Sequence, residues 1–409
     1  MRILATAYAI NPYKGSEDAT GWQYALQIAR YNDLIIYTRE NNREFIEKYI
    51  QEEDSVPDYV SRISFKYYDT PYYTRFWKKG SRGALLYFYL WQIFIAFKLN
   101  KVEKNFDVVH NLNFHNNWTP TFLWILRKPL VWGPVAFHPK IPEPYTLFFS
   151  LKSKLKNKFT WIVKRVIWSC DPFLKLAKNN AKVVLAPNKE AFDLLGVPEN
   201  KRKFLISVAS EMPTKQIKKP KTNRFVVLTV GRFVELKGFD IALKSFKEFL
   251  NNLSDSEKKL ARLIMVGKGP ALPELRKYIK IHNLQNNVDI IEWMKREQLS
   301  DYYLDASCFL FCSHEGAGMV VPEAMSYGNP VICFNNIGPG IMIDETSGIG
   351  VNYTNYSKSI QDFANALNKL FYNEKLREKL SLGALERFRS TLTWNNKGEI
   401  LKETYEEIC

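Results

Sequence analysis

The sequence predicts an α/β protein built from two doubly wound, Rossmann-like domains. Its 409 residues are more than a single domain with one hydrophobic core usually contains. Short apolar runs alternate with helix-like segments in both halves, a pattern typical of parallel sheets covered by helices. The composition shifts once to Lys, Pro, Ser and Thr, at residues 201–222, where we place a linker. We therefore expect one domain at residues 1–200, a second at residues 223–390, and a final helix at residues 391–409.

The first half begins with a strand at Met1–Ala9, a helix at Gly21–Arg30 and a second strand at Leu34–Thr38. The first ten residues carry one charge and lack a cleavage-site pattern, so we interpret them as a strand and not as a signal peptide. Val183–Ala186 has the composition of the last strand of this domain. The fourteen apolar residues of Ala84–Phe97 predict a helix of roughly 21 Å, too short to cross a hydrocarbon core of ~30 Å. This helix is either buried or interfacial.

The second half begins with a predicted strand at Phe225–Gly231, and its most informative stretch is Phe309–Gly328. Three apolar residues predict a strand, and a loop with two glycines follows it. Pro322 is typical of a first helical turn, and Gly328 of a helix end. Because the unpaired N–H groups at a helix start attract anions, this loop suits a phosphate.

Two acids flank this loop, Glu315 and Glu323, with seven residues between them. A carboxylate accepts two hydrogen bonds at once from a diol, so the pair suits a sugar attached to phosphates. The alternative is that Glu323 only complements the helix dipole and that Glu315 is a solvated loop acid.

The spacing of Glu315 and Glu323, followed by Gly328-x-Pro330-Val331-Ile332, resembles the signature of family 4 retaining glycosyltransferases, which have the GT-B fold. The resemblance implies two Rossmann-like domains facing each other across a cleft, the first binding the acceptor and the second a nucleotide sugar. The final helix would cross back to the first domain. Gly231, Arg232, Lys237 and Gly238 match the family's "GR…KG" element.

The same resemblance implies roles for the site residues. Arg232 and Lys237 would bind the donor diphosphate, Glu315 the transferred sugar and Glu323 the ribose. Further donor contacts would come from the same loop and from two other segments: Gly318, Met319 and Val320, and Gly15 and Trp293. The family mechanism is front-face attack with the leaving phosphate as base, so we assign no enzymic nucleophile, no metal and no cofactor apart from the donor.

One part of the sequence departs from the family pattern. Family members often have a histidine at the end of the strand that here is Pro129–Trp132, but this chain has Gly133-Pro134 there. His138 follows a few residues later, and His110 ends the strand Asp107–His110. Either histidine could be an active-site group or an ordinary hydrogen-bonding side chain.

The chain is basic, with a formal net charge of +16, which favours anionic partners. Residues Lys152–Lys182 combine many lysines with tryptophans, and Asp171 is their single acid. This pattern predicts an amphipathic segment on an anionic membrane surface, or alternatively a helix with a solvated lysine face. We find no nucleic-acid-binding module and expect no nucleic-acid partner.

The five cysteines show no metal-ligand spacing and no disulfide framework, which favours a reducing compartment. We expect a cytoplasmic glycosyltransferase, peripheral on the inner face of the plasma membrane, that transfers a hexosyl-type sugar to a glycan or lipid-linked acceptor in surface polysaccharide biosynthesis. The alternatives are a synthase or phosphorylase with a soluble acceptor, an inactive nucleotide-sugar-binding or scaffold protein, and a basic nucleic-acid-binding protein.

Overall fold

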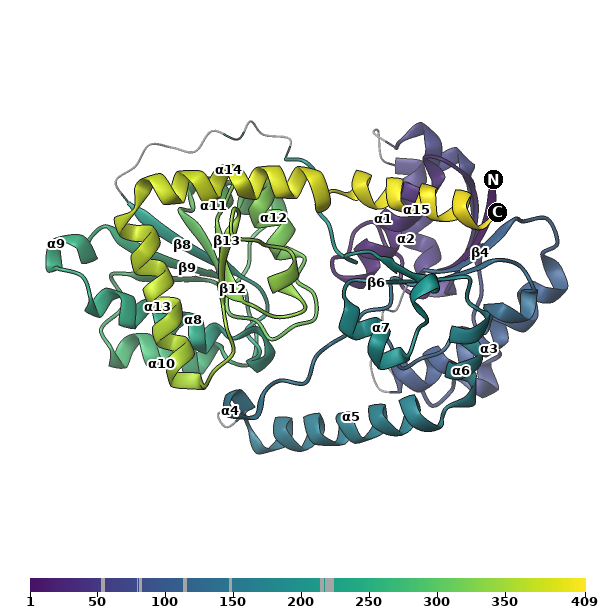
Figure 1. Ribbon diagram of the computed structural model, residues 1–409, viewed down its shortest axis with the longest axis horizontal. Coiled ribbons are helices and arrows are strands. Elements are labelled where there is room, and N and C mark those ends of the chain that lie inside the picture. Colours follow the sequence, from purple (N-terminus) through teal and green to yellow (C-terminus); the bar gives the residue numbers. More distant parts are fainter. Residues whose placement is uncertain are drawn as a thin grey trace. The chain divides into compact units, whose positions relative to one another are not determined.

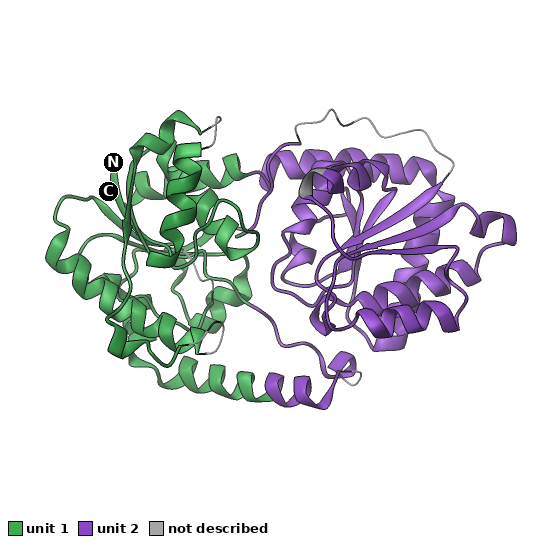
Figure 2. Cartoon of the chain, turned by 180° about the vertical axis from the view of Figure 1, so that it is seen from behind, with its two compact units in different colours: residues 1–137, 158–207, 394–409 green, residues 138–157, 208–393 purple. Residues whose placement is uncertain are grey.

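The computed structural model describes residues 1–52, 56–78, 80, 83–112, 116–146, 149–213, 217 and 224–409, with only the backbone of Arg296 and Glu297. The chain forms two compact units, coloured separately in Figure 2. Unit 1 comprises residues 1–137, 158–207 and 394–409, and unit 2 comprises residues 138–157 and 208–393. Part of the expected linker, residues 214–216 and 218–222, lies outside the described residues.

Unit 1 contains a seven-stranded parallel sheet in the order β3-β2-β1-β4-β5-β6-β7. Figure 1 shows helices on both sides of this sheet. Its strands are β1 Arg2–Thr6, β2 Asp33–Thr38, β3 Ile63–Tyr67, β4 Val108–Asn111, β5 Leu130–Trp132, β6 Val183–Ala186 and β7 Arg202–Phe204. Its helices are α1 Glu17–Ala29, α2 Arg43–Glu52, α3 Ala84–Val102, α6 Pro172–Asn180, α7 Lys189–Leu195 and α15 Trp394–Ile408. The switch in strand order falls between β1 and β4, where doubly wound sheets usually bind ligands.

Unit 2 contains a six-stranded parallel sheet in the order β10-β9-β8-β11-β12-β13. Its strands are β8 Phe225–Val230, β9 Ala261–Val266, β10 Val288–Ile291, β11 Cys308–Phe311, β12 Val331–Phe334 and β13 Gly348–Val351. Its helices are α4 Glu143–Thr146, α8 Phe239–Asn251, α9 Asp255–Lys258, α10 Leu272–Ile281, α11 Arg296–Asp305, α12 Val320–Ser326, α13 Tyr356–Tyr372 and α14 Glu374–Thr391. Helix α5, Leu151–Cys170, includes the boundary between the two units. The two Rossmann-like sheets confirm the predicted fold class.

The strands in the middle of both sheets are buried on both faces, as parallel sheets covered by helices require. All residues of β4, β8, β11 and β12 are buried. Helix α3 has two different faces: Trp91, Ile95 and Leu99 are fully buried, while Leu86 is 59% and Phe97 54% exposed. One face of α3 therefore belongs to the core of unit 1. No helix of the described chain is long and apolar enough to span a membrane.

Three predicted boundaries were wrong. We expected Val183–Ala186 to be the last strand of the first domain and a linker from residue 201, but β7 pairs with β6 and extends the sheet to Phe204. Helix α12 begins at Val320, so Pro322 is its third residue and not its first. Proline is tolerated at this position because the N–H that it lacks would have no helical partner in the first turn. The strand expected to reach Trp293 ends at Ile291.

Candidate functional site

The two loops that carry the predicted diphosphate and sugar contacts lie at one edge of the sheet of unit 2. Strands β8 and β11 are parallel neighbours, so the loops that follow them leave the sheet at the same edge. There Lys237 Nζ donates to Glu315 Oε2 at 2.6 Å. The side chain of Lys237 is 13% exposed and that of Glu315 is 17% exposed. The structure thus brings together a cation and a carboxylate that the sequence analysis assigned to one ligand.

Gly238 determines the position of Lys237. The short 3₁₀ turn Glu235–Lys237 ends at Gly238, whose φ of +64° is a left-handed conformation that glycine adopts without strain. A Cβ at this position would come within 2.0 Å of the carbonyl oxygen of Cys312. Only glycine therefore lets the loop after β8 pack directly against the loop after β11.

Arg232 is the second predicted diphosphate ligand, and it follows β8 directly. Its side chain is exposed, and it forms no ion pair with any residue that the structure describes. A guanidinium group presents several N–H donors in a fixed plane that matches phosphate oxygens. Arg232 can therefore bind an anion without first giving up another partner.

Asn336 holds the glycine-containing loop in place, and the sequence analysis missed it. Its buried amide donates to Ser313 O at 3.1 Å and to Tyr353 Oη at 3.3 Å. Its Oδ1 accepts from the N–H groups of Gly338 and Gly340 at 3.1 and 3.2 Å. One side chain therefore connects the loop after β12 to the residues just before Glu315. In the sequence, Asn336 belongs to a loop rich in Asn and Gly. Such loops are common in turns, so nothing in the sequence distinguished Asn336 as a residue that supports the site.

His314, beside Glu315, is part of an aromatic cluster. Its ring stacks on Phe334 and Tyr353 with centroids 5.1 and 5.6 Å apart, and its Nδ1 lies 3.0 Å from Tyr353 Oη. Burial lowers the pKa of His314 to about 4, so the ring is neutral at pH 7. His314 therefore supports the loop by packing and does not add a charge to the site.

A segment between β5 and α5 also belongs to this site. Residues 138–157 are part of unit 2, and the N–H of Gly316 donates to His138 Nδ1 at 3.4 Å. Tyr145 anchors the segment, because it is 1% exposed and its hydroxyl lies 2.6 Å from Ser359 Oγ. The structure thus places the exposed ring of His138 next to the residue that follows Glu315.

Glu323 lies in the first turn of α12, and its Oε2 accepts from Tyr303 Oη at 3.3 Å. Gly318 and Met319 directly precede this helix, and Val320 is its first residue. A Cβ at Gly318 would come within 2.9 Å of the Phe311 ring, so the loop lies close to the end of β11.

The remaining predicted contacts lie elsewhere. Trp293 follows β10 in the same sheet, and its side chain is 68% exposed. Gly15 belongs to unit 1, in the loop between β1 and α1, where an added Cβ would meet nothing within 4 Å. Steric crowding within the protein therefore does not explain a glycine at position 15.

His110 is a hydrogen-bonded core residue of unit 1. Its Nε2 lies 2.7 Å from the carbonyl oxygen of Gly133, and its Nδ1 lies 2.6 Å from Tyr405 Oη of α15. A carbonyl oxygen only accepts, so Nε2 carries the proton and Nδ1 accepts from Tyr405. This pair of bonds connects the C-terminal helix to the ends of β4 and β5.

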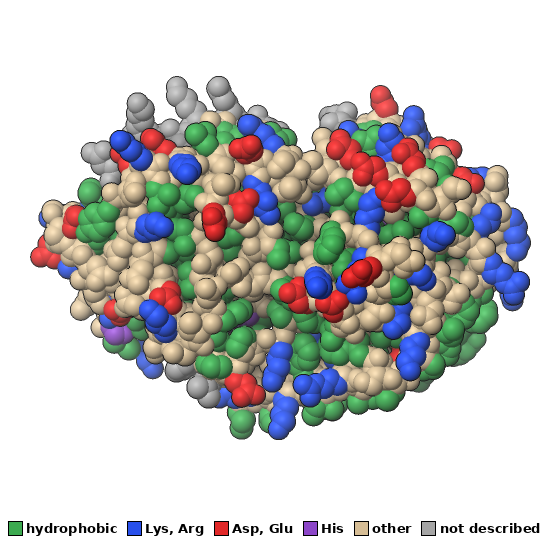
Figure 3. Space-filling model, in the orientation of Figure 1, with side chains coloured by type: hydrophobic (Ala, Val, Ile, Leu, Met, Phe, Trp, Pro, Cys, Tyr) green, Lys and Arg blue, Asp and Glu red, His purple; other side chains and the backbone are tan. Residues whose placement is uncertain are grey.

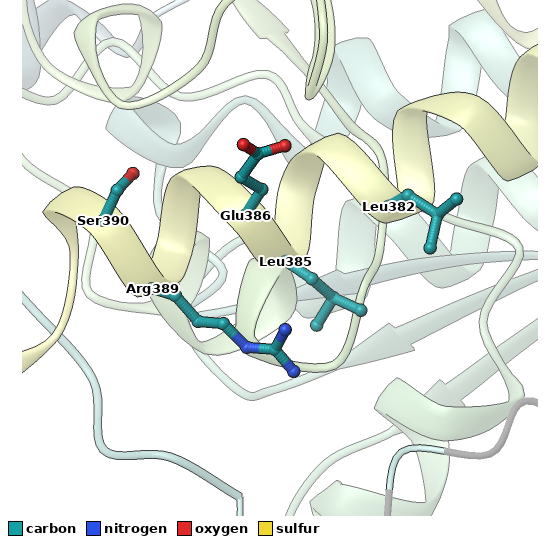
Figure 4. A pocket seen from close by; sticks show the side chains of 5 residues that line it. All are labelled: Leu382, Leu385, Glu386, Arg389 and Ser390. Carbon is teal, nitrogen blue, oxygen red and sulfur yellow. The ribbon is translucent and has the colours of Figure 1, made fainter.

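Among the described residues, no group of three or more His, Cys, Asp or Glu side chains is arranged to hold a metal ion. A shallow cavity of about 570 Å³ lies along α14 and is lined by Leu382, Leu385, Glu386, Arg389 and Ser390 (Figure 4). None of the predicted site residues lines this cavity.

Comparisons with known proteins show what the chain is similar to. Residues 211–387, which include the loops of Lys237 and Glu315, match the family model described as glycosyl transferases group 1. The chain is 32% identical over 166 residues to the amylovoran biosynthesis glycosyltransferase AmsD of Erwinia amylovora, covering 40% of this chain and 43% of AmsD. It is 28% identical over 218 residues to the uncharacterized glycosyltransferase MJ1059 of Methanocaldococcus jannaschii, covering 53% and 48%. The chain spans less than half the length of these curated relatives.

Solved structures resemble the chain over its whole length. Anabaena Alr3699/HepE, crystallised with UDP, has a TM-score of 0.64 at 15% identity and covers 100% of both chains. The lipopolysaccharide outer core galactosyltransferase WaaB in its apo form has a TM-score of 0.62 at 15% identity, covering 99% of this chain and 100% of WaaB. At this level of identity the likeness shows the fold. The chain therefore has the fold of GT-B glycosyltransferases, and residues 211–387 match the group 1 glycosyl transferase domain.

Proposed function

We propose that this protein is a retaining glycosyltransferase that moves a hexosyl-type sugar from a nucleoside diphosphate sugar to a hydroxyl of a glycan or lipid-linked acceptor. The observation that carries the proposal is the ion pair of Lys237 and Glu315, 2.6 Å apart at the carboxyl edge of the sheet of unit 2. This pair lies inside the region that matches the glycosyl transferase model.

Lys237 and Arg232 bind the donor diphosphate in this proposal. When the glycosidic bond breaks, negative charge develops on the leaving diphosphate, and two cations fixed beside it stabilise that charge. Lys237 is positioned by Gly238, and Arg232 is free to form paired hydrogen bonds with phosphate oxygens. The N–H groups of Gly318, Met319 and Val320 add further donors. Because the cations supply the positive charge, we propose that no metal is required.

Glu315 binds hydroxyl groups of the transferred sugar, and Glu323 binds those of the ribose. The contact with Lys237 keeps the carboxylate of Glu315 next to the diphosphate cation, which is where the sugar that is attached to the diphosphate must lie. Trp293 provides an exposed aromatic surface for the nucleobase.

The reaction that we propose proceeds by front-face attack of the acceptor hydroxyl, with the leaving phosphate as the base. No described residue at the site is then required to form a covalent bond to the sugar. Retention is tested by an NMR assay of the product anomer at early times. An inverted anomer would contradict the front-face mechanism while leaving the transfer activity intact.

We further propose that α5 holds the protein on an anionic membrane surface. Five apolar side chains recur at helical spacing along one face of α5 and are 52–73% exposed: Leu151, Leu155, Phe159, Ile162 and Val166. Lysines flank this stripe, and Figure 3 shows blue and green side chains together along α5 at its lower edge. An exposed apolar stripe beside cations is the arrangement that binds bilayer interfaces.

The names of similar proteins support a role in surface polysaccharide synthesis, and we propose that the protein acts on the inner face of the plasma membrane. AmsD is an amylovoran biosynthesis glycosyltransferase, and WaaB is a lipopolysaccharide galactosyltransferase. A lipid-linked acceptor would be available to an enzyme that α5 holds at the membrane.

The experiment that tests the proposal is a screen of UDP-, GDP- and ADP-sugars by thermal stabilisation, followed by assays of donor hydrolysis. A bound donor raises the melting temperature by mass action. Stabilisation together with slow hydrolysis supports the enzyme. Stabilisation without hydrolysis or transfer would instead identify a nucleotide-sugar-binding protein without activity, and no stabilisation by any donor would contradict the proposal.

A further inference from the structure

A group of cations in unit 1 has no role in the proposed donor site. Strands β1, β2 and β3 are parallel neighbours, so the residues that follow them leave the sheet at one edge. Arg39 directly follows β2, and Asp69, Arg75 and Lys78 lie in the segment that follows β3. We call Arg39, Arg75 and Lys78 the basic cluster.

Arg39 is anchored on the residues after β1. Its Nε donates to Tyr8 O at 3.0 Å, and its guanidinium lies 4.0 Å from the centroid of the Tyr8 ring. It forms no ion pair within the described part of the chain: Asp69 pairs with Arg75 at 3.5 Å, and the charge of Asp18 interacts with Lys14 as well as with Arg39. Arg39 is therefore held in a defined position while its charge stays uncompensated by a direct partner.

Both oxygens of Asp69 are already used. Oδ2 faces Arg75 at 3.5 Å, and Oδ1 accepts from Tyr87 Oη at 2.7 Å. The Nε of Arg75 is buried and has no hydrogen-bond partner among the described residues. The side chain of Arg75 as a whole is 40% exposed, so other N–H groups of its guanidinium can reach an anion from solvent.

Lys78 is the third member of the basic cluster. Its Nζ lies 5.4 Å from the centroid of the Tyr87 ring, and no described acid lies within ion-pair distance of it. The rings of Tyr8 and Tyr87, over which Arg39 and Lys78 lie, have centroids 6.1 Å apart, and Asp69 contacts both Tyr87 and Arg75, so the three cations are neighbours. The pKa of Lys78 is lowered, mainly by burial and then by the positive charge of Arg39, while Asp69 acts in the opposite direction.

The acids around the basic cluster do not balance it. Asp69 is engaged as described, and Asp18, at the start of α1, faces both Lys14 and Arg39. Like charges held together without sufficient counter-charge are typical of a binding site for an anion.

Two exposed aromatic residues lie beside these cations. Tyr72 is 75% and Tyr73 73% exposed, in the short 3₁₀ turn that directly precedes Arg75. Exposed aromatic side chains next to charged groups are typical of ligand-binding surfaces. A ligand with an apolar or sugar-ring face beside an anionic group would contact both features.

We propose that the basic cluster of Arg39, Arg75 and Lys78 binds a phosphate group of a phosphorylated acceptor. The proposal rests on the proposed function, and it adds the chemical class of the acceptor. Guanidinium groups bind phosphate through paired hydrogen bonds, and the lysine adds a point charge. The ligand is a discrete phosphate ester or diphosphate, with Tyr72 and Tyr73 contacting the part next to the phosphate.

The test measures binding of inorganic pyrophosphate by calorimetry in a background where the donor site is disabled by Arg232→Gln and Lys237→Gln. Adding Arg75→Gln and Lys78→Gln removes two cations of the basic cluster. We expect the dissociation constant for pyrophosphate to rise about tenfold or more, the effect of losing charge-assisted hydrogen bonds. The matched control, Lys101→Gln with Lys104→Gln, removes the same charge from an exposed part of unit 1 and leaves the affinity within about twofold.

Unchanged affinity in the cluster variant would overturn the proposal, and so would an equal loss in the control. Lys78→Gln alone serves as the second variant, since Lys78 has no ion pair whose loss would unfold the loop. Binding to phosphatidylglycerol vesicles is measured in parallel. If the cluster variant lost vesicle binding but kept pyrophosphate binding, the cations would contact the bilayer, which also contradicts a phosphate-ester site. Binding of the nucleotide sugar donor is also measured in a chain that carries only Arg75→Gln and Lys78→Gln. If this variant binds the donor but has lost the pyrophosphate site, the proposed function stands independently of the basic cluster. If the wild-type chain binds no donor, the proposed function itself has failed.

Discussion

Lys237 and Glu315 are 78 positions apart in the sequence, yet the ammonium and carboxylate groups lie 2.6 Å apart. Two features of the fold produce this contact. Strands β8 and β11 are parallel neighbours, and Gly238 lets the loop after β8 pack against Cys312 at the end of β11. The pair is nearly buried, so its electrostatic attraction is less screened by water than that of a surface pair.

Glu323→Gln should weaken donor binding. The substitution keeps the shape of the side chain and an oxygen that accepts from Tyr303, but it removes the charge that strengthens hydrogen bonds from a ribose diol. We expect the donor dissociation constant, measured by calorimetry, to rise about tenfold. Glu386→Gln on the exposed face of α14 is the control and should leave affinity unchanged. Equal affinities for wild type and Glu323→Gln would remove the ribose role.

Asn336→Asp should destabilise unit 2 and reduce transfer. The new carboxylate oxygen would face the carbonyl oxygen of Ser313, so the bond to Ser313 is lost and the two oxygens repel each other. We expect the free energy of unfolding in urea to fall by about 1–3 kcal/mol. Asn335→Asp is the control, because the side-chain amide of the neighbouring Asn335 donates an exposed hydrogen bond to Asn352. This substitution should lower the free energy of unfolding by less than about 0.5 kcal/mol. Similar losses for the two variants would show that Asn336 has no special role in holding the loop.

Most of the strands could be predicted from the sequence, and so could the two loops that carry Lys237 and Glu315, but the ion pair between these residues was not predicted. The buried strands are short apolar runs, and Lys237 and Glu315 belong to a recognisable spacing of glycines and charges. Strand β7 could not be predicted, because its Arg-Lys-Phe sequence is not apolar and its pairing with β6 is a tertiary interaction.

The packing of residues 138–157 on unit 2 could not be predicted from the sequence either. This segment has no helical or strand periodicity around His138, and Tyr145 becomes buried only through contacts with Ser359 and the aromatic cluster. Asn336 was missed for a similar reason, because its four hydrogen bonds join two loops whose proximity depends on the fold. Local sequence patterns contain little information about such long-range contacts.

Glu17→Gln should stabilise the protein at high pH. Burial raises the pKa of Glu17 to about 7 from 4.5, so the folded state binds the proton more tightly than the unfolded state. Stability from this group is therefore present at pH 4.5 and is lost as the pH rises towards 7, where the buried carboxyl must ionise. The glutamine variant should melt at a higher temperature than wild type at pH 8, with the difference shrinking at pH 5. Glu44→Gln on exposed α2 should show no such pH dependence, and a constant difference for Glu17→Gln would contradict the account.

Replacing the apolar stripe of α5 should release the protein from membranes. Each of Leu155, Phe159 and Ile162 is at least 52% exposed, so their change to Gln should preserve the fold. Burying each such side chain in a bilayer contributes about 1.5–3 kcal/mol, so the triple variant should bind anionic vesicles at least about 100-fold more weakly. Ile281→Gln with Leu382→Gln removes exposed apolar side chains elsewhere and should leave binding unchanged. Retention of the triple variant on vesicles would favour a solvated helix face.

The most direct test of the central claim is calorimetric binding of the preferred nucleoside diphosphate to wild type and to the Arg232→Gln, Lys237→Gln variant. Two charge-assisted contacts to the diphosphate predict a loss of affinity of about 100-fold or more, and a similar fall in turnover of the donor sugar. Lys258→Gln, which breaks the exposed pair with Asp255, should change neither value. If the double variant bound the nucleotide as tightly as wild type does, these two cations would not hold the diphosphate, and the proposed donor site would be wrong.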